Sequence, residues 1–327
     1  MADHVRIGVL GAARIVPAAL VRPARAVGSV VVSAVAARDV GRAREFADRH
    51  GIARVHDGYE ELLADPDLDA VYVPLPNGLH GRWTLAALEA GKHVLCEKPF
   101  AANAEEAARV AEAARNSGLV VMEAFHYRYH PLAARMVEVV GELGELRHVD
   151  ARFAFPLPRF SDIRYSLELA GGALMDAGCY PVSLVRLLGG GEPEVRSARA
   201  LLRGEGVDRA MRAELKFPGG HTGTVVTSMW SRTVLKVSAK VLGANGEVRV
   251  INPFAPQAGH RLVVRLKGQR RVERFDRRPS YEYQLEAFAD AVLHGKPFPT
   301  TPDDAVATMR VIDDIYRAAG LPLRRPA

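Results

Sequence analysis

Near its start the chain contains the stretch Arg6-Ile7-Gly8-Val9-Leu10-Gly11-Ala12-Ala13-Arg14-Ile15, which decides the fold of its first half. Residues 6–10 form a short apolar run, typical of a buried parallel strand. A helical pattern follows to about residue 27, with Pro17 in its first turn, where proline is tolerated. A glycine turn between a strand and a helix lets backbone amides meet a pyrophosphate. We therefore expect a nucleotide-binding turn formed by Gly11, Ala12, Ala13, Arg14 and Ile15.

The match of this turn to the dinucleotide fingerprint is partial. A G-x-G-x-x-G pattern beginning at Gly11 would need glycines at positions 13 and 16, where the chain has Ala13 and Val16. From these residues alone, an ordinary turn between a strand and a helix remains open. The order of the elements that follow favours the nucleotide-binding interpretation.

Strands and helices alternate over about the first 125 residues. Further buried strands are expected at residues 30–37, 70–73, 93–96 and 120–124. Helices are expected at residues 42–50, 59–63 and 79–90, and from 103 to about 116, where Asn103 and Glu106 form a capping-box pattern. This order predicts a parallel, doubly wound sheet of the Rossmann type.

The pattern changes after Phe125. Apolar residues alternate with polar ones at residues 149–155 and 211–217, and strand-like runs follow at 223–229, 234–242, 247–251, 261–266 and 271–275. A hairpin turn is expected at residues 243–246, and helices at 281–293 and 302–319. We predict an α/β Rossmann domain at residues 1–124 and an α+β domain at residues 125–327 with a large, mostly antiparallel open sheet.

The end of the second strand bears on the choice of cofactor. Rossmann domains that bind NAD usually place a carboxylate there, which binds the ribose 2′-hydroxyl. Here Ala37 stands at about that position and Arg38 follows, and an arginine fork suits a 2′-phosphate. We predict NADP, with NAD possible, because Asp39 could be either the ribose acid or a helix cap.

Bulk composition excludes several classes of protein. The chain has 327 residues, 48% hydrophobic and 25% charged, and a formal net charge of +6. Its arginines are spread along the chain, so we expect no nucleic-acid partner. The start lacks the apolar core of a signal peptide, and the longest apolar stretch is too short for a membrane span. Two cysteines make no disulfide framework, so a cytoplasmic protein is expected.

Four further segments carry a resemblance to a known family. They are Val73-Pro74-Leu75-Pro76-Asn77-Gly78-Leu79-His80, Cys96-Glu97-Lys98-Pro99, Phe125-His126-Tyr127-Arg128-Tyr129-His130-Pro131 and Gly171-Gly172-Ala173-Leu174-Met175-Asp176-Ala177-Gly178-Cys179-Tyr180. With them the chain resembles, nearly end to end, the glucose-fructose oxidoreductase, inositol dehydrogenase and rhizopine catabolism family, Gfo/Idh/MocA. Tyr180, where many relatives have histidine, resembles the branch with xylose dehydrogenases and dimeric dihydrodiol dehydrogenases.

The resemblance implies a catalytic role for three residues. Lys98 would contact the substrate hydroxyl and the nicotinamide ribose, where an ammonium stabilises a developing alkoxide. Tyr180 would be the general acid and base, provided that a nearby cation such as Lys98 favours its ionised form. Asp176 precedes Tyr180 by four residues on a probable helix, so the two share a face, and it would orient the substrate or Lys98.

The resemblance also implies binding roles. Pro76, Asn77 and His80 would lie beside the nicotinamide ribose, although His80 could equally cap the helix that begins there. Glu97 and Arg128 are expected to help position the cofactor. Arg164 would face the substrate or be a solvated arginine. His126 stands where many relatives have asparagine, which leaves its role open at the substrate side.

These residues predict hydride transfer between nicotinamide and a carbinol of an aldose, a related cyclic polyol or a dihydrodiol. A keto-sugar-nucleotide reductase is the alternative enzyme, and a non-catalytic NADP-binding sensor or scaffold is the alternative class. No metal is expected, because the histidines lack ligand spacing. The open sheet should leave one apolar face free, so we expect a homodimer or homotetramer formed through it.

Overall fold

The computed structural model describes residues 4–327, so the expectation about a signal peptide falls partly on residues outside the described ones. The described chain divides into two compact units. One contains Met1–His126 and Pro279–Val306, and the other contains Tyr127–Arg278 and Ala307–Ala327.

The first unit is built on a parallel six-stranded sheet with the order β3-β2-β1-β4-β5-β6. Its strands in the described chain are β1 (Val5–Leu10), β2 (Val30–Ala36), β3 (Arg54–His56), β4 (Ala70–Val73), β5 (His93–Cys96) and β6 (Val121–Glu123). The strand order reverses at β1, which lies between β2 and β4. Ligands of open α/β sheets bind at the carboxyl ends of the strands at this switch point.

Helices connect these strands. They are η1 (Pro17–Val21, a π-helix), α1 (Arg22–Val27), α2 (Val40–His50), α3 (Tyr59–Ala64), η2 (Asn77–Leu79, a 3₁₀ turn), α4 (His80–Glu89) and α5 (Ala104–Ser117). The predicted cap of α5 is present, because the Asn103 side chain accepts a hydrogen bond from the amide of Glu106 at 2.9 Å. The Glu106 carboxylate accepts one from the amide of Ala102 at 2.8 Å.

The second unit contains an eight-stranded sheet with the order β14-β13-β12-β11-β7-β10-β9-β8. Its strands in the described chain are β7 (Leu146–Ala154), β8 (Glu194–Leu202), β9 (Asp208–Lys216), β10 (Thr222–Ser228), β11 (Lys236–Gly243), β12 (Gly246–Ile251), β13 (Arg261–Leu266) and β14 (Gln269–Glu273). All pairs are antiparallel except β7 and β10, which run parallel. The predicted large, mostly antiparallel sheet is confirmed.

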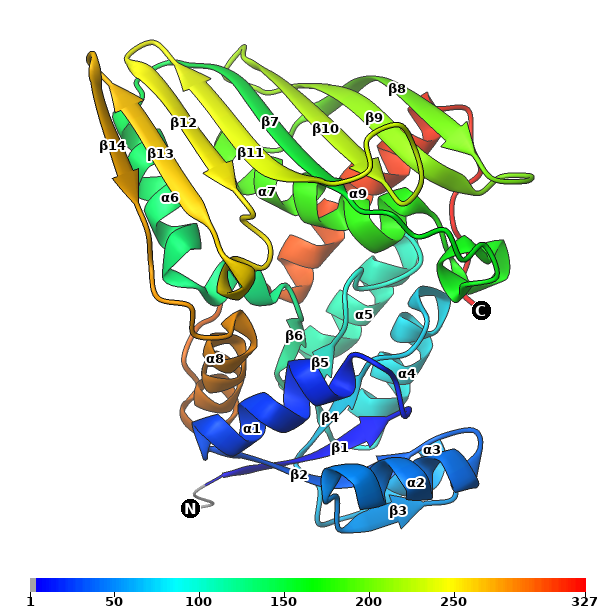
Figure 1. The fold of residues 1–327 in the computed structure, drawn as a ribbon. Coiled ribbons are helices and arrows are strands. Elements are labelled where there is room, and N and C mark those ends of the chain that lie inside the picture. The colour runs from blue at the N-terminus through cyan, green and yellow to red at the C-terminus, as the bar shows by residue number, and fades with distance from the viewer. Residues whose placement is uncertain (1–3) are drawn as a thin grey trace. The chain divides into compact units, whose positions relative to one another are not determined.

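Helices cover one face of this sheet. Figure 1 shows α6 (Pro131–Glu142) and α7 (Cys179–Gly189) against it. The buried side chains of β12, Val248 and Val250, point to this face, because they alternate with exposed ones. A π-helix, η6 (Leu174–Gly178), precedes α7, and shorter 3₁₀ turns occur at η3 (His126–Tyr129), η4 (Ile163–Tyr165), η5 (Leu167–Leu169) and η7 (Pro256–Ala258).

The opposite face of the sheet is not apolar, which corrects our expectation. Register places Asp150, Lys240 and Arg249 on this face. Asp150 forms an ion pair with Arg152 within β7, and Glu247 of β12 forms ion pairs with Lys240 of β11 and with Arg249. Glu247 forms ion pairs with Lys240, Arg249 and Arg265, which lower its pKa to about 2. Exposed apolar side chains, such as those of Ile251 and Val272, are interspersed with the charged ones, so this face is mixed.

The end of the chain departs from the expected domain plan. We expected all residues after 124 to form the second domain, but α8 (Ser280–His294) packs against α1 in the first unit (Figure 1). The last helix, α9 (Pro302–Ala318), begins in the first unit and continues in the second. The chain therefore returns to its first unit after completing the sheet.

Three elements were not expected from the sequence. β3 has only one apolar residue among its three, and β8 is an exposed edge strand without a regular alternation of apolar and polar residues. α6 follows directly from the motif at residues 125–131. No helix within residues 4–327 is long and apolar enough to cross a membrane.

Candidate active site

The Gly11 turn joins β1 to η1 in the first unit. The Gly11 amide donates to the Ala36 carbonyl at 2.7 Å, and its φ of +113° is a backbone conformation that favours glycine. A Cβ atom there would lie 3.1 Å from the side chain of Leu75. Arg14 and Ile15, which follow, are exposed. The missing second and third glycines therefore do not prevent the tight turn at the strand end.

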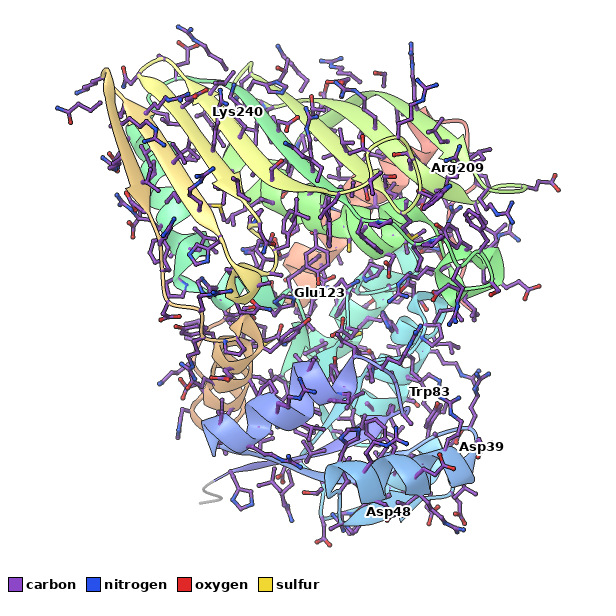
Figure 2. All side chains as sticks on the ribbon, viewed as in Figure 1. Asp39, Asp48, Trp83, Glu123, Arg209 and Lys240 are labelled. Carbon is purple, nitrogen blue, oxygen red and sulfur yellow. The ribbon has the colours of Figure 1, made fainter. Side chains whose placement is uncertain are left out.

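The end of β2 is followed by an exposed arginine and by a carboxylate that caps the next helix. Asp39 is the N-cap of α2, because its side chain accepts a hydrogen bond from the Arg42 amide at 3.0 Å. This supports the helix-cap interpretation of Asp39, whose position Figure 2 labels. Arg38 is exposed beside it. The cation and the engaged carboxylate fit a 2′-phosphate better than a free ribose hydroxyl.

His80 is the first residue of α4 and does not cap it. The ring is buried, with Nδ1 2.7 Å from the Pro99 carbonyl and Nε2 2.7 Å from the Leu75 carbonyl. The pKa of His80 is lowered to about 4, mainly by burial and also by the charge of Lys98, although both carbonyls favour the protonated ring. The ring thus joins the turn after β4, which includes Pro76 and Asn77, to the turn after β5.

Lys98 lies directly after the carboxyl end of β5, as the sequence predicts. The turn is held by the Glu97 amide, which donates to the Val73 carbonyl at 3.2 Å. The Glu97 carboxylate accepts a hydrogen bond of 2.6 Å from the Tyr72 hydroxyl. Lys98 itself is half-buried, and its peptide bond to Pro99 is cis. Because it follows the end of β5, Lys98 lies at the edge of the sheet where a ligand of this fold binds.

His126 lies in a buried cluster of the first unit. Its Nδ1 is 2.7 Å from the Ser280 hydroxyl, and its ring centroid is 4.0 Å from that of Tyr281. Burial raises the pKa of Tyr281, and the Glu97 carboxylate raises it further. Ser280 and Tyr281 were not among the predicted residues. Their signal was present in the aromatic-rich run at the start of the predicted helix 281–293.

Glu123 ends β6 in the same unit and is fully buried (Figure 2). Its carboxylate accepts a hydrogen bond of 3.0 Å from the Phe100 amide, and its own amide donates to the Thr300 carbonyl. This tertiary contact supports the turn after Lys98. Arg128 belongs to η3 and is half-exposed.

Asp176 lies within the π-helical turn η6 of the second unit. Its carboxylate is 3.0 Å from Nε of Arg164, which also binds Asp162 at 3.1 Å. The sequence predicted Asp176 and Arg164 separately, and the structure brings them together. Insertions of π-helix occur often at functional sites. Arg164 is held between two carboxylates, which raise its pKa against the opposing effect of burial, so it is not a freely solvated arginine.

Tyr180 follows at the start of α7, inside an aromatic cluster of the second unit. Ring centroids of Phe153, Phe254 and Tyr127 lie 5.4, 5.4 and 6.0 Å from its own. Only 8% of Tyr180 is exposed. The Tyr127 hydroxyl bonds with that of Ser183 at 2.9 Å. The cluster fixes the phenol ring and shields it from water, and it was not foreseen from the sequence.

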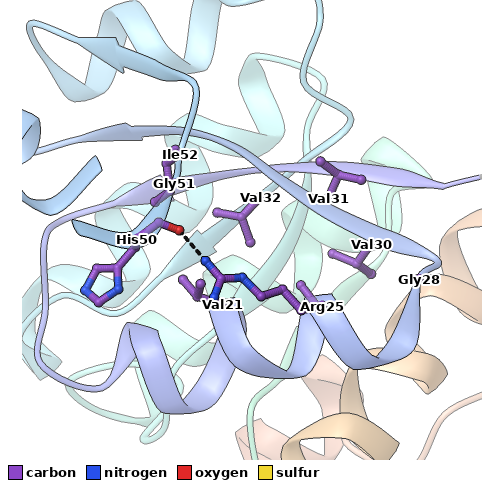
Figure 3. Close-up of a pocket in the computed structure, with 10 residues that line it drawn as sticks. Val21, Arg25, Gly28, Val30, Val31, Val32, His50, Gly51 and Ile52 are labelled. Carbon is purple, nitrogen blue, oxygen red and sulfur yellow. Dashed lines mark hydrogen bonds between the residues drawn. The ribbon is translucent and has the colours of Figure 1, made fainter. Parts of the chain in front are cut away.

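A concavity of about 280 Å³ also lies in the first unit (Figure 3). Arg25 crosses it and donates to the His50 carbonyl at 2.7 Å. Val30 and Val32, at the start of β2, form part of its apolar wall. This concavity is near the amino end of β2, whereas the Gly11 turn and Arg38 follow the carboxyl ends of β1 and β2. We do not assign it to the nucleotide.

Both cysteines are buried and free. Among the described residues, no group of three or more His, Cys, Asp or Glu side chains is arranged to hold a metal ion.

Comparisons with known proteins cover almost the whole chain. Residues 5–125 match the GFO_IDH_MocA model, described as an oxidoreductase family with an NAD-binding Rossmann fold. Residues 132–249 match the GFO/IDH/MocA C-terminal domain.

Matches to individual proteins also cover nearly the whole chain. The chain is 40% identical over 314 residues to D-xylose 1-dehydrogenase (NADP(+)) 2 of Haloferax volcanii, covering 95% of this chain and 96% of the relative. It is 37% identical to a dTDP-3,4-didehydro-2,6-dideoxy-alpha-D-glucose 3-reductase of Streptomyces violaceoruber, covering 97% and 96%. A 3-ketoreductase of Actinomadura kijaniata, solved with NADP and TDP-benzene, superposes with a TM-score of 0.89 at 30% identity, covering 97% and 98%.

Proposed function

Because the chain belongs to the GFO/IDH/MocA oxidoreductase family, we propose that it is an NADP-dependent dehydrogenase that oxidises the anomeric carbinol of an aldose. The proposal includes a related cyclic polyol or a dihydrodiol, in which a secondary carbinol would be oxidised in the same way. The observation that carries the proposal is Tyr180, a buried phenol in an aromatic cluster. It lies on one continuous helical segment with Asp176, whose carboxylate pairs with Arg164. The xylose dehydrogenase relative supports the choice of an aldose.

The chain's own residues suit NADP. We propose that the Gly11 turn, with Ala12, Ala13, Arg14 and Ile15, receives the pyrophosphate. Arg38 would bind the 2′-phosphate through its planar fork, while Asp39 remains the cap of α2. Pro76, Asn77, His80, Glu97 and Arg128 complete the proposed cofactor site.

In the proposed mechanism, one residue transfers the proton and another stabilises the developing charge. NADP, when bound, supplies the acceptor for the hydride. Lys98 donates a hydrogen bond to the substrate oxygen and stabilises the negative charge that develops on it. Tyr180, as the phenolate, accepts the hydroxyl proton during oxidation, and its hydroxyl returns a proton during reduction. The aromatic side chains around Tyr180 exclude water from this transfer.

Asp176 and Arg164 orient the sugar in this proposal. Arg164 holds the carboxylate of Asp176, which can accept a hydrogen bond from a neighbouring sugar hydroxyl. His126 is assigned to the substrate side as well, where its contact with Ser280 fixes the ring.

A keto-sugar-nucleotide reductase is the second candidate. It is favoured by 37% identity to the Streptomyces reductase and by the similarity to the Actinomadura 3-ketoreductase. Tyr180 would then protonate the oxygen of the ketone as the carbonyl carbon receives the hydride that NADPH would supply, and Lys98 would stabilise the charge that develops on that oxygen. The two candidates differ in substrate size, because only the second requires space for a nucleotide diphosphate.

We further propose a cytoplasmic homodimer or homotetramer formed through the open face of the eight-stranded sheet. The buried free thiols of Cys96 and Cys179 suit a reducing compartment. The charged side chains on the sheet face favour a polar interface, whose strength would fall as the salt concentration rises. Light scattering at low and high salt tests this, and a monomer in both conditions would contradict it.

The deciding experiment is an absorbance screen at the reduced-nicotinamide band. Purified protein is mixed with NADP or NAD and with aldoses, inositols or dihydrodiols, and with NADPH and a keto-sugar nucleotide in a parallel arm. Turnover of an aldose with NADP is the expected result. Turnover only of the sugar nucleotide would favour the second candidate. Binding of NADP without any turnover would favour a sensor or scaffold.

A further inference from the structure

Arg324 lies in the core of the second unit, although the residues that flank it are more exposed. Arg324 has 1% of its surface exposed, and its guanidinium binds the Asp208 carboxylate at 2.8 Å. Asp208 opens β9 and is fully buried. The Tyr316 hydroxyl, from α9, donates to the same carboxylate oxygen at 3.0 Å, and the guanidinium lies 4.2 Å above the Tyr316 ring. We call Asp208, Tyr316 and Arg324 the C-terminal clamp.

The clamp holds the segment that leads into the π-helical turn η6. Arg324 Nε donates to the Gly171 carbonyl at 2.7 Å. The second carboxylate oxygen of Asp208 accepts from the amide of Leu174 at 2.7 Å, and Leu174 is the first residue of η6. A single buried carboxylate therefore caps the turn that carries Asp176, while its partner arginine fixes the residue three positions earlier.

The segment has no space to move toward the clamp. Gly172 has a φ of +136°, and a Cβ there would overlap Oδ1 of Asp208 and lie 2.9 Å from Arg324. The amide of Gly172 donates to the Arg164 carbonyl at 2.8 Å, and the amide of Asp176 donates to the Gly172 carbonyl at 3.0 Å. The backbone that the clamp holds thus also places both members of the Asp176–Arg164 ion pair.

A buried ion pair adds little net stability compared with apolar side chains of the same volume. Its distinctive contribution is direction, because a carboxylate and a guanidinium accept only a narrow range of partner positions. Here hydrogen bonds of both groups reach the backbone of residues 171–174. These contacts specify where η6 begins, and hence where Asp176 and Tyr180 point.

We propose that Asp208, Tyr316 and Arg324 are positioning residues for the reaction, which act by holding η6 and the start of α7 in register. The proposal rests on the proposed function for the roles of Asp176 and Tyr180. These three residues then act through the backbone of residues 171–174, which they bind.

The test compares Arg324→Met and Arg324→Lys with Arg135→Met. Arg135 forms an ion pair with Glu273 elsewhere in the same unit, at 2.8 Å, and serves as the matched control. We expect Arg324→Met to lower kcat on the order of 10²-fold with a smaller change in KM, because misplacement of about 1 Å at a reacting group has that effect. Arg324→Lys, which keeps the charge, should recover part of the loss, and Arg135→Met should keep kcat.

Amide hydrogen exchange of residues 171–180, measured without substrate, gives an independent readout. Faster exchange confined to this segment in Arg324→Met supports the clamp. Unchanged exchange, or an equal increase throughout the unit, would overturn it. If Arg324→Met does not fold, Tyr316→Phe, which removes one hydrogen bond, decides by the same readouts. A wild type without turnover would refute the proposed function, while the exchange result would still judge the clamp.

Discussion

The turn after β5 and the segment at residues 171–180 both carry predicted catalytic residues, yet they are held in different ways. The turn with Lys98 follows a central strand, and backbone bonds to Val73 and the buried His80 hold it close to the sheet. The second segment depends on Asp208 and Arg324, which are 34 and 153 residues away from their partners in sequence. Both segments use tertiary contacts, but the partners of the first lie nearer in sequence than those of the second.

This difference predicts that catalytic residues at the strand end can be changed at little structural cost. Replacement of Lys98 by Ala should lower kcat about 10³-fold to 10⁴-fold, because charge stabilisation at the substrate oxygen is lost. The unfolding midpoint should stay near that of the wild type. Steady-state kinetics with thermal unfolding measure both, and the exposed Lys296→Ala is the control. Full activity in Lys98→Ala would refute the mechanism.

Tyr180→Phe tests the second segment. We expect kcat to fall about 10²-fold, because the proton acceptor is lost while the ring and its aromatic contacts remain. Tyr127→Phe is the matched control, since it removes another buried hydroxyl from the same cluster, the one that bonds to Ser183. Equal losses of kcat in the two variants would mean that the cluster, rather than the Tyr180 hydroxyl, matters.

Arg38→Asp sharpens the prediction for the nucleotide side. The preference for NADP over NAD should fall on the order of tenfold to a hundredfold, because a carboxylate repels the 2′-phosphate and accepts from the ribose hydroxyl. Fluorescence titration with the two cofactors measures this without turnover. Arg42→Asp, at an exposed arginine on α2, controls for charge alone. An unchanged preference in Arg38→Asp would remove Arg38 from the cofactor site.

The smallest expected effect concerns His80 and pH. Its folded pKa of about 4 lies below the unfolded value of about 6.5, so the unfolded chain binds more protons between these values. Stability should therefore be full above about pH 6.5 and decrease as the pH falls toward 4. Between pH 7.5 and pH 5 we expect a loss on the order of 2 kcal/mol in the free energy of unfolding. Denaturant unfolding of His80→Asn should lack this component, and an identical pH dependence would contradict it.

Much of the first unit follows from its sequence. The strands at residues 70–73 and 93–96 have the predicted bounds, and Lys98 lies at the end of the second one. Continuous apolar runs and glycine turns encode such strands locally. β3 could not be predicted, because only one of its three residues is apolar. α8 could not be assigned to the first unit, because its packing against α1 depends on the whole fold.

By itself the sequence predicted the parallel sheet, the glycine turn, the cation at Arg38, and Lys98, Asp176 and Tyr180 as candidate catalytic residues. Only the tertiary structure decided how those groups are held: the pairing of Asp176 with Arg164, the aromatic cluster around Tyr180, and the buried Asp208–Arg324 contact. The physical reason is the distance along the chain over which each effect acts. Hydrophobic periodicity and turn chemistry act over a few neighbouring residues, whereas the direction of a buried side chain depends on partners that the folded chain brings from far along its length.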